Sequence, residues 1–193
     1  MGRSPGPGDG SQCRHRCQFS SKTGDRGHAG CGRCSQRGNT TESTAEDWRK
    51  MLDLNVVALC LCTREAVASM QEHGTDDGHI IHMNSISGHL VYPFLRNHLY
   101  SITKHMVTAH TEAVRQALRK GNTNIKISAI SPGMVATDFG FRSGMRKEES
   151  EKMIQERACL QPEDVTESVI HILSRPPHVQ IHDLIMRPTK EKH

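Results

Sequence analysis

No leucine, isoleucine or valine occurs before Leu52 in this chain of 193 residues. Nine of the 16 glycines and four of the seven cysteines lie in the first 40 residues. Branched aliphatic side chains supply most of the buried area that offsets the conformational entropy lost on folding. A segment without them is expected to remain disordered. The sequence therefore predicts two unlike parts, a disordered head rich in Gly, Ser, Arg and Cys over 1–43 and a folded body over 44–193.

Composition excludes several classes of protein. No apolar run approaches the roughly 20 residues that span a bilayer, and the N-terminus lacks the apolar stretch of a signal peptide. The net charge of +4 is mild and comes largely from the head, where seven Lys and Arg face three Asp and Glu. We therefore expect a cytoplasmic protein with no membrane contact and no nucleic-acid partner.

Two alternatives to disorder remain open for the head. Two close pairs of thiols have the spacing of zinc ligands: Cys13, Cys17, Cys31 and Cys34. Only Phe19 is available to pack beside such a site, so no metal is expected. The glycine-rich run 23–32 is of the kind that contacts phosphate, but no strand pattern precedes it and no apolar periodicity follows it.

The body alternates helical and strand patterns. Apolar residues at three- and four-residue steps predict helices over 45–71, 99–119, 148–157 and 162–173. A capping box of Ser43 with Glu46, or of Thr44 with Asp47, would start the first helix. Apolar runs predict strands over 79–84, 124–130 and 179–186. Strands that alternate with helices indicate an α/β fold, a parallel sheet with helices on both faces.

Polar residues follow the predicted strands at one edge of this sheet. Tyr100 and Lys104 share a helix face, and an ammonium beside a phenol lowers its pKa and suits it to acid–base chemistry. Ser85 and the segment 131–137 come where two parallel strands end, which is where such sheets bind ligands. Asn55 is either a satisfied core amide or a group that holds water in a proton path.

Four segments of the body, in this order, resemble the short-chain dehydrogenase/reductase superfamily. They are Leu54-Asn55-Val56, the run 79–88, Tyr100-Ser101-Ile102-Thr103-Lys104 and the run 131–137. The resemblance covers the chain from about residue 41 to its end. It implies a Rossmann-like sheet and an NADP-dependent oxidoreductase, with NAD not excluded. The implied reaction interconverts carbonyl and hydroxyl groups of small molecules such as ketosteroids and hydroxysteroids.

The resemblance also implies a role for each matching residue. Tyr100 donates the proton, while Lys104 binds the nicotinamide ribose and lowers the pKa of Tyr100. Ser85 orients the carbonyl, with Ser87 as a minor alternative, and Asn55 holds a relay water. The implied cofactor-binding set is Tyr100, Lys104, Pro132, Gly133, Met134, Val135 and Thr137.

A substrate lid and a subunit interface are implied in the same way. Residues 138–160 form the mobile lid, in which Phe139, Phe141 and Met145 are candidate steroid contacts. The helices over 45–71 and 99–119 form the interface of a homo-oligomer.

The chain departs from the family pattern in its head. The Thr-Gly-x-x-x-Gly-x-Gly turn that binds the pyrophosphate is absent, because Thr23-Gly24 and Gly30-x-Gly32 are spaced two residues too far apart. Three or four of the family's seven strands are absent as well. We therefore expect an incomplete sheet of the C-terminal strands only, with an unpaired apolar edge at 79–84 and weak cofactor affinity. The chain is then an impaired oxidoreductase or, alternatively, an inactive fragment that acts through subunit association.

Overall fold

The computed structural model describes residues 40–91 and 98–191. The first helical segment comprises α1 (Ala45–Leu52), the π-helical turn η1 (Asp53–Val57) and α2 (Ala58–Glu72). It is followed by β1 (His79–Met83), the 3-10 turn η2 (Ile86–Gly88), α3 (His98–Lys120) and β2 (Lys126–Pro132). The last elements are α4 (Phe139–Arg142), α5 (Lys147–Glu156), α6 (Pro162–Leu173) and β3 (Asp183–Met186).

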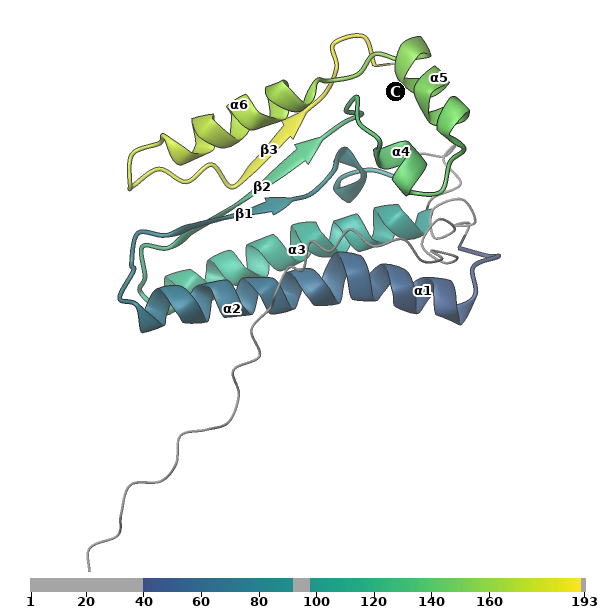
Figure 1. The fold of residues 1–193 in the computed structure, drawn as a ribbon. Helices are drawn as coiled ribbons and strands as arrows, with labels where there is room; N and C mark the ends of the chain where they lie inside the picture. The colour runs from purple at the N-terminus through teal and green to yellow at the C-terminus, as the bar shows by residue number, and fades with distance from the viewer. Residues whose placement is uncertain (1–39, 92–97, 192–193) are drawn as a thin grey trace, which may run out of the picture.

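The strands form one parallel sheet in the order β1-β2-β3. Helix α3 lies on one face with α1 and α2 beside it, and α6 covers the other face (Figure 1). This arrangement confirms the predicted Rossmann-like α/β class with its C-terminal strands. Since all three strands run the same way, the segments that follow them meet at one edge, the carboxyl edge of the sheet.

One edge of β1 is unpaired, as predicted from the sequence. Within 40–91 and 98–191, β1 forms its ladder with β2 alone. Met83, its last residue, is 51% exposed although it is apolar. Unpaired strand edges of this kind are prone to pair with further chains.

The first helix is continuous in direction but not in hydrogen bonding. It starts at Thr44, whose hydroxyl accepts a bond from the Asp47 amide while the Asp47 carboxylate accepts from the Thr44 amide. The second of the two predicted capping boxes is therefore the one formed. The π turn at η1 interrupts the α-helix and contains Asn55. Such turns occur frequently at functional sites.

Strand β2 forms the centre of the core. Ile127, Ala129 and Ile130 along it are fully buried, because helices cover both faces. Towards the start of the strands, Ile127 packs with Leu118 and Ile125 against partly buried side chains of α2, β1 and α3. Burial of each such aliphatic side chain contributes about 2 kcal/mol, so this layer dominates the stability of the fold.

Four strand boundaries differ from the predicted ones, including the end of β2 and the start of β3. β2 continues to Pro132, because pairing with β3 extends that far and the Gly133 amide donates to the Met186 carbonyl. β3 begins only at Asp183. In the segment before it, side-chain hydrogen bonds to β2 take the place of the backbone ladder. Gln180 Nε2 donates to the Ile127 carbonyl, and the Ser128 hydroxyl bonds to residue 181.

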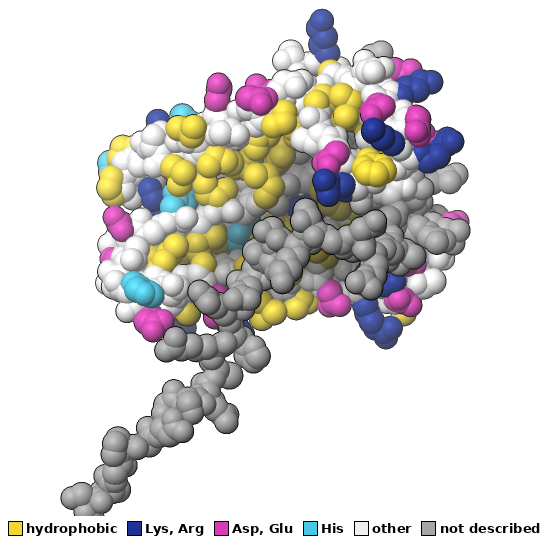
Figure 2. All heavy atoms as spheres, viewed as in Figure 1, with side chains coloured by type: hydrophobic (Ala, Val, Ile, Leu, Met, Phe, Trp, Pro, Cys, Tyr) yellow, Lys and Arg dark blue, Asp and Glu magenta, His cyan; other side chains and the backbone are white. Residues whose placement is uncertain are grey.

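The exposed apolar side chains on the surface of the described residues include two groups. Leu54, Val57 and Leu61 form a stripe along η1 and α2, with 70%, 46% and 46% of their surface exposed. Hydrophobic side chains also gather over α6 and β3 (Figure 2), where Ile170 and Ile185 are more than half exposed.

The predictions for the head, including the thiol pairs and the run 23–32, lie outside the described residues. Within the part of the chain that is described, no group of three or more His, Cys, Asp or Glu side chains could hold a metal ion. None of the helices in that part is long and apolar enough to cross a membrane.

Candidate active site

Three of the four predicted catalytic residues meet at the carboxyl edge of the sheet. Tyr100 and Lys104 lie in the first turns of α3, and Ser85 lies between β1 and η2. The Ser85 side chain is hydrogen-bonded to Tyr100. Lys104 Nζ lies 5.6 Å from the centroid of the Tyr100 ring. The structure therefore brings a hydroxyl, a phenol and an ammonium into one cluster.

The turn that carries Ser85 is fixed by its own backbone and by a glycine. The Ser85 hydroxyl accepts a hydrogen bond from the Ser87 amide at 3.1 Å and so caps η2. A Cβ added at Gly88 would lie only 2.8 Å from the Lys104 carbonyl and still closer to the Asn84 side chain. Only glycine permits this close approach of the turn to α3. Ser85, rather than Ser87, contacts Tyr100, which favours the first of the two predicted serines.

Burial dominates the titration of Tyr100. It raises the pKa of the phenol, and the hydrogen bond from Ser85 offsets part of that rise. The predicted lowering of this pKa by Lys104 is wrong for the structure described. The reason is physical: burial disfavours the charged phenolate, and it also lowers the pKa of the neighbouring Lys104 to about 8.

Lys104 is held by the end of β1. Its Nζ donates to the Met83 carbonyl at 2.9 Å, at the unpaired edge of that strand. An ammonium has three N–H donors, so two remain for other acceptors. This geometry fits a lysine that binds hydroxyl groups of a ligand beside Tyr100.

Asn55 joins the π turn to α3. Its Nδ2 donates to the Thr103 hydroxyl at 3.1 Å, and that hydroxyl in turn donates to the Tyr100 carbonyl at 2.8 Å. Its Nδ2 also lies 3.2 Å from Met51 Sδ. Both contacts match a satisfied amide at a helix interface, and its partner Thr103 directly precedes Lys104 along α3.

The predicted cofactor segment Pro132–Thr137 leaves the end of β2 and is pinned to the start of α6. The Met134 carbonyl accepts from the Leu160 amide, and the Ala136 amide donates to the Leu160 carbonyl, both at 2.8 Å. A Cβ at Gly133 would approach Pro188 to 3.2 Å, so the segment also lies against the chain after β3. Together with Lys104, it fits the nicotinamide half of a dinucleotide. Within the described ranges, no glycine-rich turn for a pyrophosphate accompanies it.

The predicted lid contributes an aromatic side chain to the site. The Phe139 ring, on α4, lies 6.0 Å from the Tyr100 ring, centroid to centroid, and is 58% exposed. Phe141 is half exposed as well. Met145 instead lies next to Gly140, where its sulfur would be 3.1 Å from an added Cβ. Phe139 is therefore the lid residue nearest to the candidate acid–base group.

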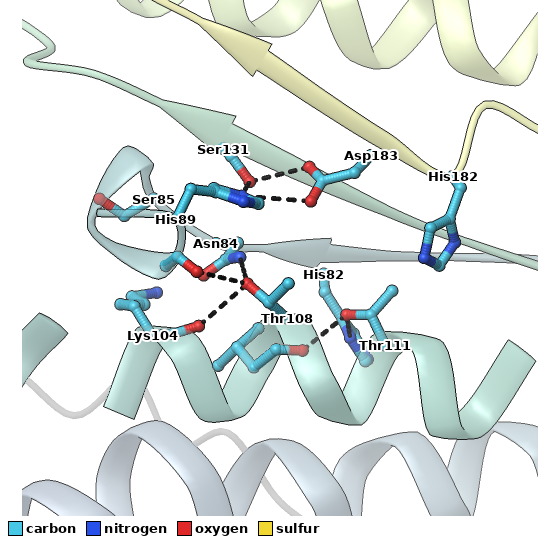
Figure 3. A network of polar contacts seen from close by, with 12 residues as sticks. His82, Asn84, Ser85, His89, Lys104, Thr108, Thr111, Ser131, His182 and Asp183 are labelled. Atoms are coloured by element: carbon cyan, nitrogen blue, oxygen red, sulfur yellow. Dashed lines mark hydrogen bonds and ion pairs between the residues drawn. The ribbon is translucent and has the colours of Figure 1, made fainter. Parts of the chain in front are cut away.

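The structure adds a polar cluster that the sequence did not indicate. His89, Ser131 and Asp183 point toward one another from the segment after η2, from β2 and from β3 (Figure 3). His89 Nε2 lies 2.9 Å from Ser131 Oγ and 3.2 Å from Asp183 Oδ2. Ser131 Oγ donates to Asp183 Oδ1 at 2.9 Å. We call these three residues the edge cluster.

A second set of bonds holds the same turn from the side of α3. Asn84 Nδ2 donates to the Thr108 hydroxyl at 2.8 Å, and Thr108 bonds to the carbonyls of Gly88 and Lys104 (Figure 3). The turn with Ser85 is therefore bonded to a helix on one side and, through His89, to two strands on the other.

Comparison with known proteins gives a matching family model and similar sequences. The family model described as Enoyl-(Acyl carrier protein) reductase matches residues 28–177. Dehydrogenase/reductase SDR family member 11 of Homo sapiens is 50% identical over 145 residues, which are 75% of this chain and 56% of that protein. Farnesol dehydrogenase of Aedes aegypti is 41% identical over 145 residues, 75% of this chain and 55% of that protein.

The solved structures that resemble this chain lead in the same direction. The closed form of serine dehydrogenase complexed with NADP+ is 30% identical, with a TM-score of 0.66. The match covers 78% of this chain and 59% of that one. The chain therefore spans a little over half the length of the relatives it matches.

Proposed function

Because the chain belongs to the short-chain dehydrogenase/reductase superfamily, we propose that it carries the acid–base centre of an oxidoreductase that interconverts carbonyl and hydroxyl groups. The observation that carries the proposal is the cluster of Ser85, Tyr100 and Lys104 at the carboxyl edge of the sheet. A nicotinamide dinucleotide supplies the hydride in such a reaction.

Tyr100 is the proton donor in the direction of reduction. Its raised pKa keeps the phenol protonated near neutral pH, so the hydroxyl is able to donate to an oxygen that gains negative charge. Ser85 donates a hydrogen bond to the same oxygen or to the phenolate that remains. Lys104 lies over the same ring, and its own pKa of about 8 leaves the ammonium mainly charged at pH 7 for binding the ribose hydroxyls.

The cofactor is NADP in this proposal, with NAD as the alternative. Two N–H donors of Lys104 support binding of the ribose hydroxyls, and the segment Pro132–Thr137 is the proposed partner of the carboxamide. Asn55, whose Nδ2 donates to Thr103, also holds a relay water in this proposal. Fluorescence titration with NADPH and with NADH would measure the affinity for each cofactor.

The proposed substrate is an apolar ketone or alcohol of the steroid type. The exposed Phe139 ring beside Tyr100, with Phe141 on the same short helix, supports an apolar substrate surface. A panel that pairs ketosteroids with small polar ketones tests this, since apolar contacts favour the former through buried area.

A second candidate function is association with a full-length subunit, without catalysis by this chain. The exposed apolar stripe of Leu54, Val57 and Leu61 supports it, because stripes of this kind mark interfaces. The same stripe and α3 support a homo-oligomer. Light scattering of the chain, alone and mixed with a full-length relative, measures both forms of association.

The deciding experiment is a single-turnover assay. The purified chain, in excess over a ketosteroid, is mixed with NADPH, and loss of NADPH absorbance is followed. We expect slow oxidation of NADPH in the native chain and none in Tyr100→Phe. Absence of turnover in the native chain, together with a stable complex with a full-length relative, would select the second function.

A further inference from the structure

The edge cluster contains the residue types of a hydrolase triad, but its geometry is different. In a triad the histidine stands between the serine and the carboxylate, using one nitrogen for each. Here a single nitrogen, His89 Nε2, faces both, and Ser131 gives its proton directly to Asp183. Ser131 is also fully buried, so its hydroxyl is inaccessible to a substrate. The cluster is therefore structural, and it joins the segment after η2 to β2 and β3.

Its members come from three places that the proposed reaction needs to hold together. His89 directly follows η2, whose first turn Ser85 caps. Ser131 stands immediately before Pro132, where the cofactor segment begins. Asp183 is the first residue of β3; its Oδ1 accepts a hydrogen bond from Ser131, and its Oδ2 lies 3.2 Å from His89 Nε2. One carboxylate thus joins the serine turn to the start of the cofactor segment.

Resting on the proposed function, we propose that His89 and Asp183 are positioning residues for Ser85. Asp183 fixes His89, and His89 fixes the turn that presents the Ser85 hydroxyl to Tyr100. The bonds of Thr108 to Gly88 and of Asn84 to Thr108 hold this turn against α3. A backbone bond from the Asn84 amide to the Ile130 carbonyl holds the start of the turn to β2, and His89 holds its far end to Ser131 and Asp183.

The consequence for the reaction follows from proximity. Rates depend steeply on the position of groups that contact the reacting atoms, and a displacement of about 1 Å costs about 10²-fold. Loss of the edge cluster moves Ser85 without removing it. We therefore expect a lower turnover rate with unchanged chemistry.

The test uses hydrogen exchange, which requires no catalysis. Exchange of amides in the peptide 84–91 is compared by mass spectrometry in the native chain, His89→Leu, His89→Gln and Asp183→Asn. The peptide 107–118 in α3 reports general destabilisation. We expect exchange in 84–91 to rise about tenfold in His89→Leu with 107–118 unchanged, and to return close to native in His89→Gln. Glutamine restores the effect because its amide keeps an N–H donor near the position of Nε2.

A matched control exists on the opposite face of the sheet. His79 Nε2, on β1, lies 2.8 Å from Ser128 Oγ, on β2, and both are far from Ser85 in the strand register. His79→Leu removes a bond of the same kind and is expected to leave exchange in 84–91 unchanged. Asp183→Asn keeps one acceptor oxygen and should give an intermediate rise.

Two results would overturn the positioning role. One is unchanged exchange in 84–91 for both His89→Leu and Asp183→Asn. The other is a rise that is equal in 84–91 and 107–118, because the cluster would then stabilise the whole fold and position nothing. Single-turnover rates add a second readout, with about a tenfold decrease expected in His89→Leu and rescue in His89→Gln. If no variant turns over, the proposed function fails, while the exchange result still decides the role of the cluster.

Discussion

Two polar clusters each contain a histidine, and they differ in what surrounds it. His82, on β1 and bonded to α2 and α3, is 2% exposed and lies 2.9 Å from the hydroxyls of both Thr63 and Thr111. His89, at the carboxyl edge, faces a serine and a carboxylate and is partly exposed. Figure 3 shows both along one side of the sheet.

The difference shows that the surroundings of a histidine side chain decide its role. Around His82 there is no carboxylate partner, and burial together with the charges of His110 and Lys104 lowers its pKa to about 4. It is neutral, and its two hydrogen bonds join β1 to α2 and α3. Around His89 the carboxylate of Asp183 anchors a turn at the site. The buried part of the sheet that contains His82 and Ile127 should therefore govern stability, and the carboxyl edge should govern activity.

The largest effect that would sharpen this contrast is expected at the edge. Tyr100→Phe removes the proposed proton donor while keeping the ring that packs on Phe139. General acid catalysis is worth about 10²–10⁴-fold, so the single-turnover rate should fall by at least about 10² with the free energy of unfolding nearly unchanged. Equal rates in the two proteins would assign the proton transfer to another group.

The corresponding variant in the middle of the sheet is Ile127→Ala. The side chain is fully buried beside Leu118 and Ile125, so its removal leaves a cavity. We expect a loss of about 2–5 kcal/mol in the free energy of unfolding, measured by urea denaturation. A loss below about 1 kcal/mol would contradict the comparison, because the buried part of the sheet would then not be the stabilising region.

Acid tests the neutral state of His82. Because its pKa in the fold is about 4 against 6.5 for the free side chain, protons bind the unfolded chain more readily. Stability is therefore constant above about pH 6.5 and falls as the pH drops towards 4. The total loss from this residue is of order 2–3 kcal/mol. His110, whose pKa burial also lowers, adds to the fall with the same sign.

Urea denaturation at pH 7 and pH 5 measures this fall. His82→Asn removes the titrating ring, so its stability should decline less between the two pH values than that of the native chain. Parallel declines would show that other groups carry the pH dependence.

The smallest expected effect is at the edge again. Thr108→Val removes the hydroxyl that bonds Asn84 and the Gly88 carbonyl. A lost hydrogen bond of this kind costs about 1 kcal/mol, and we expect faster exchange in 84–91 rather than in α3. If exchange rises only in α3, the hydroxyl supports the helix and not the turn.

Sequence reasoning reached the elements whose signals are local. The first-turn proline and apolar periodicity predicted α6 over its observed range, 162–173. Ser85, Tyr100 and Lys104 could be predicted as a site because each stands in a short pattern, and the parallel sheet brings the three together at one edge. Asp183 was not found, because it lies inside a predicted strand, 52 residues from Ser131, and no local pattern links the two. The direction of the Tyr100 pKa was also missed, since spacing along a helix contains no information about burial.

The π turn at η1 has a consequence for alignment along the first helix. A π turn accommodates one residue more than an α-helical turn, so it changes the rotational phase of everything after it. Without that extra residue, α2 would be rotated by about 100° relative to α1, the angle between successive residues of a helix. Thr63 would then face away from His82, although no residue of α2 had been altered. Deleting a single residue within Asp53–Val57 would therefore turn the side chains of α2, some 15 Å further along the chain, away from their present neighbours.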